Sequence, residues 1–139
     1  MRPHFLKHCD RRIRDGLAWI WDFWFGPDRE LLAYFERPCA GRAWRRAFPE
    51  TNKDDLRDFL EILTDSMYFP LGNRLKFRPD DDLFDIYRSR YGDETPSRDD
   101  LECETFVWGI CERFGLDEAV VDKACQEDST LGALFAVCS

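Results

Sequence analysis

The sequence predicts an all-α protein, and three observations support this fold class. Apolar residues recur at the i, i+3, i+4, i+7 spacing of a helix face, no segment alternates as a half-buried strand would, and Gly and Pro separate the segments. Hydrophobic residues make up 44% of the 139 residues and aromatic residues 15%, which is enough apolar side chain for a packed core. At this length we expect one domain with an appended segment.

The front segment, residues 1–49, predicts helices with an aromatic stripe. Its first helix, over residues 11–25, has one apolar face made of Ile13, Leu17, Ile20, Trp21 and Trp24. Gly26-Pro27 ends that helix, a second follows to Pro38, and residues 41–48 add a turn or two. We expect residues 1–49 to be a helical extension that packs, through Trp21 and Trp24, on a bundle formed by residues 50–139.

The bundle begins with a long helix. Thr51 or Asn52 caps it, and Asp54 and Asp55 stand in its first turn, where the helix dipole favours carboxylates. Its predicted buried stripe is Leu56, Phe59, Leu60, Leu63 and Met67. Residues 69–87 predict a loop with a short turn near 83–87, and residues 88–100 predict a polar connection.

Three further helices are predicted after residue 99. The first has a stripe of Cys103, Phe106, Val107, Ile110 and Phe114. Gly115 is the expected C-cap, and Asp117 opens a short helix. Ser129 or Thr130 caps the last helix.

The charge is uneven along the chain. The net charge is −8, with a basic front segment and an acidic remainder. Such a chain repels nucleic acid and anionic membranes, and no apolar stretch reaches the ~20 residues of a membrane span. We expect a cytoplasmic protein with no nucleic-acid or membrane partner. Four arginines surround Trp44, and we expect them to pair with the acidic part rather than with nucleic acid: Arg37, Arg42, Arg45 and Arg46.

Little in the sequence predicts metal or redox chemistry. No two of the six cysteines have CxxC spacing, so we expect reduced, mostly buried thiols at Cys9, Cys39, Cys103, Cys111, Cys125 and Cys138. A metal site at His4, His8 and Cys9 is a weak alternative to no site. Four aspartates could suggest a calcium site, but turn capping is the favoured interpretation of them: Asp80, Asp81, Asp82 and Asp85.

Catalytic patterns are also lacking. Both histidines lie near the N-terminus, and the chain has no Gly-rich phosphate loop and no nucleophile elbow. We therefore expect no enzymatic activity and no cofactor.

The order of elements over residues 52–138 resembles the acyl carrier protein fold, a four-helix bundle. The segment RPDDDLFDIY is similar to the carrier loop, and DDLECETFVWGICERFGL is similar to the Asp-Ser-Leu signature with its second helix. That helix ends on Glu112, Arg113, Phe114 and Gly115, as Glu-x-Phe-Gly does in the family. STLGALFAVC is similar to the family's last helix.

The resemblance implies a missing cofactor handle. Asp99 and Leu101 stand at the family's Asp and Leu, and Asp100 stands where the carrier serine holds phosphopantetheine. A carboxylate cannot replace that hydroxyl, so the chain looks most like small bacterial proteins of unknown role that lack the serine. Ser97 is the nearest alternative attachment residue.

The resemblance also implies a surface for a protein partner with basic character. The candidate residues are Asp99, Asp100, Leu101, Glu102, Glu104 and Trp108. For the acidic ones, helix capping and a solvated face are the simpler interpretation, and for Trp108 it is packing against residues 1–49. The favoured function is a non-catalytic protein–protein interaction through this acidic helix. The alternatives are a genuine phosphopantetheine carrier using Ser97, or an immunity- or antitoxin-type acidic binding protein.

Overall fold

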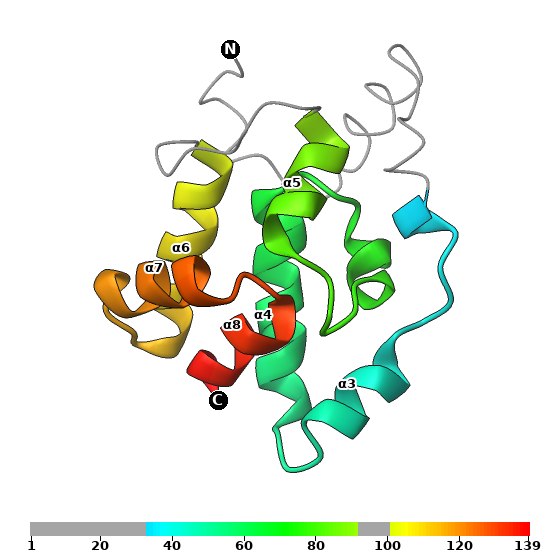
Figure 1. Cartoon of the computed structure of the whole chain (residues 1–139). Coiled ribbons are helices and arrows are strands. Elements are labelled where there is room, and N and C mark those ends of the chain that lie inside the picture. The colour runs from blue at the N-terminus through cyan, green and yellow to red at the C-terminus, as the bar shows by residue number, and fades with distance from the viewer. Residues whose placement is uncertain (1–32, 92–100) are drawn as a thin grey trace.

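The computed structural model describes residues 33–91 and 101–139 as an all-helical fold. Residues 33–35 are helical, and the remaining elements have the bounds α3 Gly41–Ala47, α4 Lys53–Ser66, the 3₁₀ helix η2 Leu71–Lys76, α5 Leu83–Tyr91, α6 Leu101–Phe114, α7 Glu118–Glu127 and α8 Leu131–Cys138 (Figure 1). Within these two ranges there is no strand, only an isolated bridge between Asp82 and Thr130. The predicted helix over 11–25, with Trp21 and Trp24, lies outside the described residues.

Local signals set the helix ends as predicted. The side chain of Asn52 accepts a hydrogen bond from the backbone N–H of Asp54 at the start of α4. The hydroxyl of Thr130 does the same for Ala133 at the start of α8. Gly115 follows α6 with φ +66°, a left-handed conformation that glycine adopts without steric cost.

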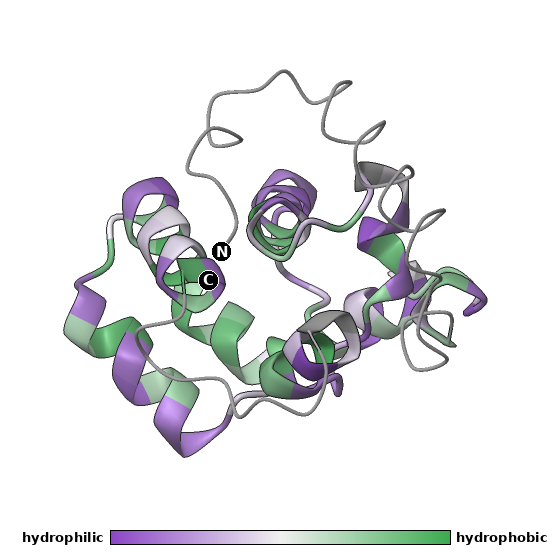
Figure 2. Cartoon of the chain, turned by 90° about the horizontal axis from the view of Figure 1, so that it is seen from above, coloured by the Kyte–Doolittle hydropathy of each residue, from purple (hydrophilic) through white to green (hydrophobic). Residues whose placement is uncertain are grey.

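Helix α4 is the centre of the core. Its residues Phe59, Leu60 and Leu63 are fully buried, and Met67 after its end is buried as well, whereas Leu56 is half-buried. Phe59 lies between Phe106 of α6 and Phe135 of α8, with ring centroids 6.0 and 5.2 Å away. Hydrophobic residues gather on the inner sides of the helices and hydrophilic residues on the outer sides (Figure 2).

Residues 33–49 contribute to the same core. Trp44 of α3 has no exposed surface, and its Nε1 donates a 2.8 Å hydrogen bond to the backbone oxygen of Phe77. The Trp44 ring lies edge-on to Phe135 at 5.8 Å. The domain boundary between residues 49 and 50 stays a prediction. Trp44 contacts residues on both sides of this boundary, namely Phe48 and Phe135.

The prediction of a loop over residues 69–87 with only a short turn is wrong. The segment contains η2, and α5 extends from Leu83 to Tyr91. The Asp82 carboxylate caps α5 by accepting from the backbone N–H of Phe84 and Asp85, and Ile86 is fully buried. Tertiary burial therefore lengthens a helix whose own apolar pattern is short.

None of the helices in the described ranges is both long and apolar enough to cross a membrane.

Candidate interaction surface on helix α6

Helix α6 is held against the core by one face. Cys103, Phe106 and Ile110 are buried, as the apolar stripe predicts, and Val107 and Phe114 pack at its edge. A Cβ at Gly109 would lie 2.9 Å from Ile62 Cγ2, so glycine at this position lets α6 approach α4 closely. Arg113 fixes the end of the helix by donating to Asp58 at 2.6 Å and to Asp55 at 3.0 Å.

The opposite face of α6 carries Glu104, Trp108 and Glu112, which we call the acidic α6 face. All three are exposed, and their spacing of four residues places them one helical turn apart. Neither glutamate forms an ion pair among the residues that the structure describes. The face therefore presents an aromatic ring between two carboxylates with no described basic neighbour.

Trp108 does not pack on residues 33–49, the described part of the front segment, and its predicted packing against residues 1–32 lies outside the described residues. Its side chain is 67% exposed, the largest exposed hydrophobic side chain in the described ranges. The reason is its position in the helix. Trp108 lies on the side of α6 turned away from Phe106 and Ile110, and those two residues already fill the space between α6 and α4.

The other predicted partner residues are placed less favourably. Leu101 and Glu102, at the start of α6, are half-buried. Asp99, Asp100 and Ser97 lie outside the described residues, so the serine position and its alternative have no structural account. Only Glu104 and Trp108 of the predicted set form one exposed stripe, and Glu112 joins them from its helical spacing alone.

Acidic residues of α7 extend this surface past Cys111. The Cys111 thiol is half-buried, and burial is the main cause that raises its pKa. The negative charges of Glu118, Asp122 and Asp117 raise this pKa further. These carboxylates lie at or near the start of α7, beside the last turns of α6. The negative potential is therefore shared by two helices, which is more than the sequence predicted.

The other thiols only partly follow the prediction that cysteines are mostly buried. All the described cysteines are free, and Cys103 is buried. Cys39 is exposed, so the prediction is wrong there, because it precedes α3 outside the core. Cys125 and Cys138 are half-buried, and burial raises their pKa to about 11 and about 12.

The acidic run over residues 80–85 has a structural role. Asp81 accepts two 2.7 Å hydrogen bonds from Arg37 Nη1 and one of 2.6 Å from the backbone N–H of Arg78. Asp82 caps α5 and accepts from the Ser129 hydroxyl, and Asp85 pairs with Arg88. Turn capping thus accounts for Asp81 and Asp82, whereas Asp85 forms an ion pair, and the described residues contain no cluster of metal-ligand type. His4, His8 and Cys9 lie outside them.

The cavity between α4, α6, α7 and α8 is too small for an organic ligand. This apolar cavity has a volume of about 10 Å³, the size of one water molecule, and Phe59, Ile110 and Cys138 are among the residues that line it.

The four arginines around Trp44 do not behave alike. Arg37 pairs with Asp81, as expected. Arg42, Arg45 and Arg46 are exposed, and none of them pairs with a described residue, so for these three the predicted pairing is absent from the described ranges and stays a prediction for the acidic residues outside them. Helix α3 turns them outward because its buried side is taken by Trp44. The run GRAWRRA without an acidic residue was the available signal for such a surface.

Comparisons of the chain with protein-family models, with curated proteins and with solved structures found no match.

Proposed function

We propose that this chain is a non-catalytic, acyl-carrier-like protein that binds a basic protein surface through the acidic α6 face. The observation that carries the proposal is the exposed Trp108 between Glu104 and Glu112, neither of which pairs with a described cation. Trp is the residue most enriched where binding energy concentrates, and carboxylates beside it select a cationic partner.

The order of the helices supports the carrier-like part of the proposal. A 14-residue α4, a long connection, a 14-residue α6, a shorter α7 and a final α8 follow one another as they do in carriers. Helix α5 departs from that pattern, because it places nine helical residues in the connection. In carriers, the second helix meets partner enzymes, and α6 is its counterpart by register.

The buried polar groups support the non-catalytic part. The Thr64 hydroxyl donates to the backbone oxygens of Leu60 and Glu61, and the Ser89 hydroxyl donates to that of Ile86. Asp81 is engaged by Arg37 and by the backbone of Arg78. Each of these groups completes local structure, and none of them lines the small cavity between α4, α6, α7 and α8.

The test is affinity capture from the native host with matched variants. We expect the wild-type chain to retain a protein that a Glu104→Lys/Glu112→Lys variant and a Trp108→Ala variant retain at least tenfold less. The control, Glu36→Lys/Glu50→Lys, makes the same charge change at exposed residues away from α6. Equal retention by the face variants and the control would contradict the proposal.

The missing handle is tested by intact mass after co-expression with a broad-specificity phosphopantetheinyl transferase. We expect the wild-type mass to stay unchanged, because Asp100 supplies no hydroxyl. A gain of one phosphopantetheine that Ser97→Ala abolishes would establish the genuine carrier instead. Modification of Asp100→Ser would indicate that the carrier docking surface persists, and its absence would limit the likeness to helix order.

A further inference from the structure

Helix α3 carries an arginine surface that no carboxylate of the described residues neutralises. Arg42, Arg45 and Arg46, which we call the α3 arginines, are all exposed, and residues 41–47 contain no acidic residue. Five other arginines of the described ranges are each paired with a carboxylate, namely Arg37, Arg57, Arg74, Arg88 and Arg113, whereas the Arg78 side chain, like the arginines of α3, pairs with no described carboxylate. Concentrated positive charge of this kind is unusual on a chain whose net charge is −8.

The surface is rigidly presented. Trp44 anchors α3 through its buried ring and its hydrogen bond to Phe77, and the backbone N–H of Ala40 donates to Leu75 at 2.7 Å. Phe48, just after α3, stacks on Trp44 at 5.9 Å and meets Phe135 edge-on at 5.0 Å. Arginines on an anchored helix lose less freedom on binding than arginines on a loose segment.

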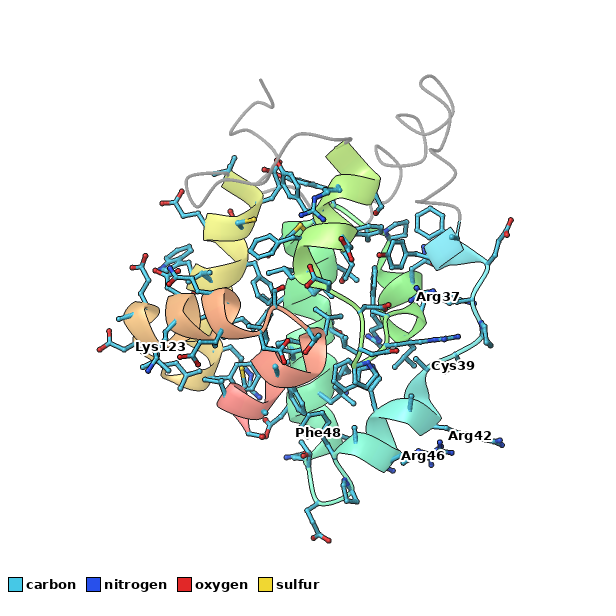
Figure 3. The ribbon with its side chains drawn as sticks, in the orientation of Figure 1. Arg37, Cys39, Arg42, Arg46, Phe48 and Lys123 are labelled. Atoms are coloured by element: carbon cyan, nitrogen blue, oxygen red, sulfur yellow. The ribbon has the colours of Figure 1, made fainter. Side chains whose placement is uncertain are left out.

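The α3 arginines cannot reach the acidic α6 face of their own chain. Helix α3 lies on one flank of α4, and α6 with α7 lies on the other (Figure 1). Figure 3 shows Arg42 and Arg46 pointing away from the molecule, on the side opposite to Lys123 of α7. The two charged surfaces therefore face opposite directions, and only contact between molecules would bring them together.

We propose that the basic partner of the acidic α6 face is a second copy of this chain, which docks its α3 arginines there. The inference rests on the proposed function, since it names the partner of the same face. Arg42 and Arg46 stand about 6 Å apart along α3, and Glu104 and Glu112 stand about 12 Å apart along α6. Side by side, the two helices bring one of these guanidinium groups over Trp108 and the other level with one of the two flanking carboxylates.

The α3 arginines are chemically complementary to both parts of the acidic α6 face, the indole ring and the carboxylates. A guanidinium stacks favourably on an indole face, and Trp is the best aromatic partner for a cation. Carboxylates accept paired hydrogen bonds from the same guanidinium groups. A nucleic acid would satisfy the arginines but would be repelled by the excess negative charge of the chain and would leave Trp108 without a role.

Because the two surfaces differ, the contact is head-to-tail. An open assembly keeps one free α3 at one end and one free α6 face at the other. The assembly therefore grows with protein concentration unless it closes into a ring. Salt screens the charges, so it weakens both the guanidinium–indole contact and the guanidinium–carboxylate pairs.

The test is analytical ultracentrifugation of the whole chain and two charge-reversal variants. We expect wild-type protein to associate at low salt and to dissociate in about 1 M NaCl, where the Debye length is about 3 Å. Arg42→Glu/Arg46→Glu and Glu104→Arg/Glu112→Arg should each be monomeric alone. Mixed together, they should associate again, because the intact α6 face of the first is complementary to the intact α3 of the second, and the two reversed surfaces are complementary to each other as well.

The control is Lys53→Glu/Lys123→Glu, which removes two exposed cations outside α3 and should associate like the wild type. Circular dichroism of each variant separates loss of association from loss of fold. Monomeric wild type, or failure of the mixed variants to pair while both remain folded, would overturn self-docking. If labelled single-stranded RNA then binds the wild type and not the arginine variant, the α3 surface belongs to nucleic acid.

The two proposals fail separately. Self-docking fails alone when the mixed variants do not pair but capture from the host still depends on Glu104 and Glu112. Both fail when neither the chain itself nor any captured protein depends on that face.

Discussion

At the scale of the residue, the same side chain meets opposite fates in two helices. Trp44 is fully buried and its indole N–H is satisfied by Phe77, whereas Trp108 is 67% exposed. Burying an indole stabilises the fold only where a pocket and a hydrogen-bond acceptor are both present. Trp44 has both, and Trp108 faces solvent between two glutamates. The first is therefore part of the core and the second is a candidate for binding.

The thiols give a prediction for pH dependence. Burial raises the pKa of Cys138 to about 12 and that of Cys125 to about 11, above the value of 9.0 for a free thiol. Between these values the unfolded chain has lost protons that the folded chain keeps, so the free energy of unfolding falls as pH rises from 9 toward 11 and 12. Below pH 9 the contribution is fully present.

Urea unfolding at pH 7 and pH 10 measures this effect. We expect the wild type to lose more stability between the two pH values than a Cys125→Ala/Cys138→Ala variant does. Alkylation at pH 8 should modify the exposed Cys39 faster than these two thiols. An equal loss in both proteins would show that other groups control the alkaline limit.

At the scale of the element, α8 docks through backbone contact. The backbone N–H of Gly132 donates to the backbone oxygen of Pro79 at 2.7 Å. The backbone N–H of Leu131 donates to the backbone oxygen of Asp81 at 2.8 Å. The start of α8 thereby lies against the segment that precedes α5, and the Asp82–Thr130 bridge extends the contact. This close approach is possible because residue 132 has no side chain.

Replacing Gly132 with alanine should loosen that docking. The new Cβ would lie 2.9 Å from the Pro79 carbonyl oxygen and 3.2 Å from Pro79 Cβ, and backbone cannot move aside cheaply. We expect a loss of about 1–3 kcal/mol in the free energy of unfolding, measured by urea titration. Gly72→Ala is the matched control, since its Cβ would meet nothing within 4 Å. Similar losses in both variants would place the cost in backbone conformation and not in contact with Pro79.

At the scale of the whole molecule, segments far apart in sequence are joined by a few polar contacts over an aromatic core. Arg37 links residues 33–49 to the loop before α5 through Asp81, and Lys76 Nζ donates to the Arg37 carbonyl oxygen at 2.5 Å. The aromatic contacts of Trp44 and Phe48 with Phe135 join residues 33–49 to α8. Residues 33–49 are thus expected to unfold together with the helices that follow.

Asp81→Asn tests this coupling. Asp81 is largely buried and accepts from Arg37 and from the backbone of Arg78, so the neutral amide should cost about 2 kcal/mol. Asp85→Asn, which removes the exposed i,i+3 pair with Arg88, should cost under about 0.5 kcal/mol. Thermal unfolding followed by Trp fluorescence and by circular dichroism should give one coincident transition in the wild type. Separate transitions would show that residues 33–49 unfold independently.

The sequence by itself determined the all-α class, the starts of α4 and α8 and the end of α6. Caps such as Asn52 and Thr130 act over two or three residues, and the left-handed Gly115 acts at a single position, so their effects can be predicted from neighbouring residues alone. The buried stripes of α4 and α6 follow from helical periodicity in the same way. The assignment to a carrier-like bundle goes beyond these local signals and stays a proposal.

The tertiary structure alone decided which polar and aromatic side chains are left without a partner. Arg37 and Arg42 are five residues apart, yet one meets Asp81 and the other meets solvent, because α3 turns its arginines away from α4. Trp108 is exposed and α5 is long for the same kind of reason, namely which helix lies opposite. Pairing of long side chains depends on contacts between segments distant in sequence, and neither periodicity nor composition contains that information.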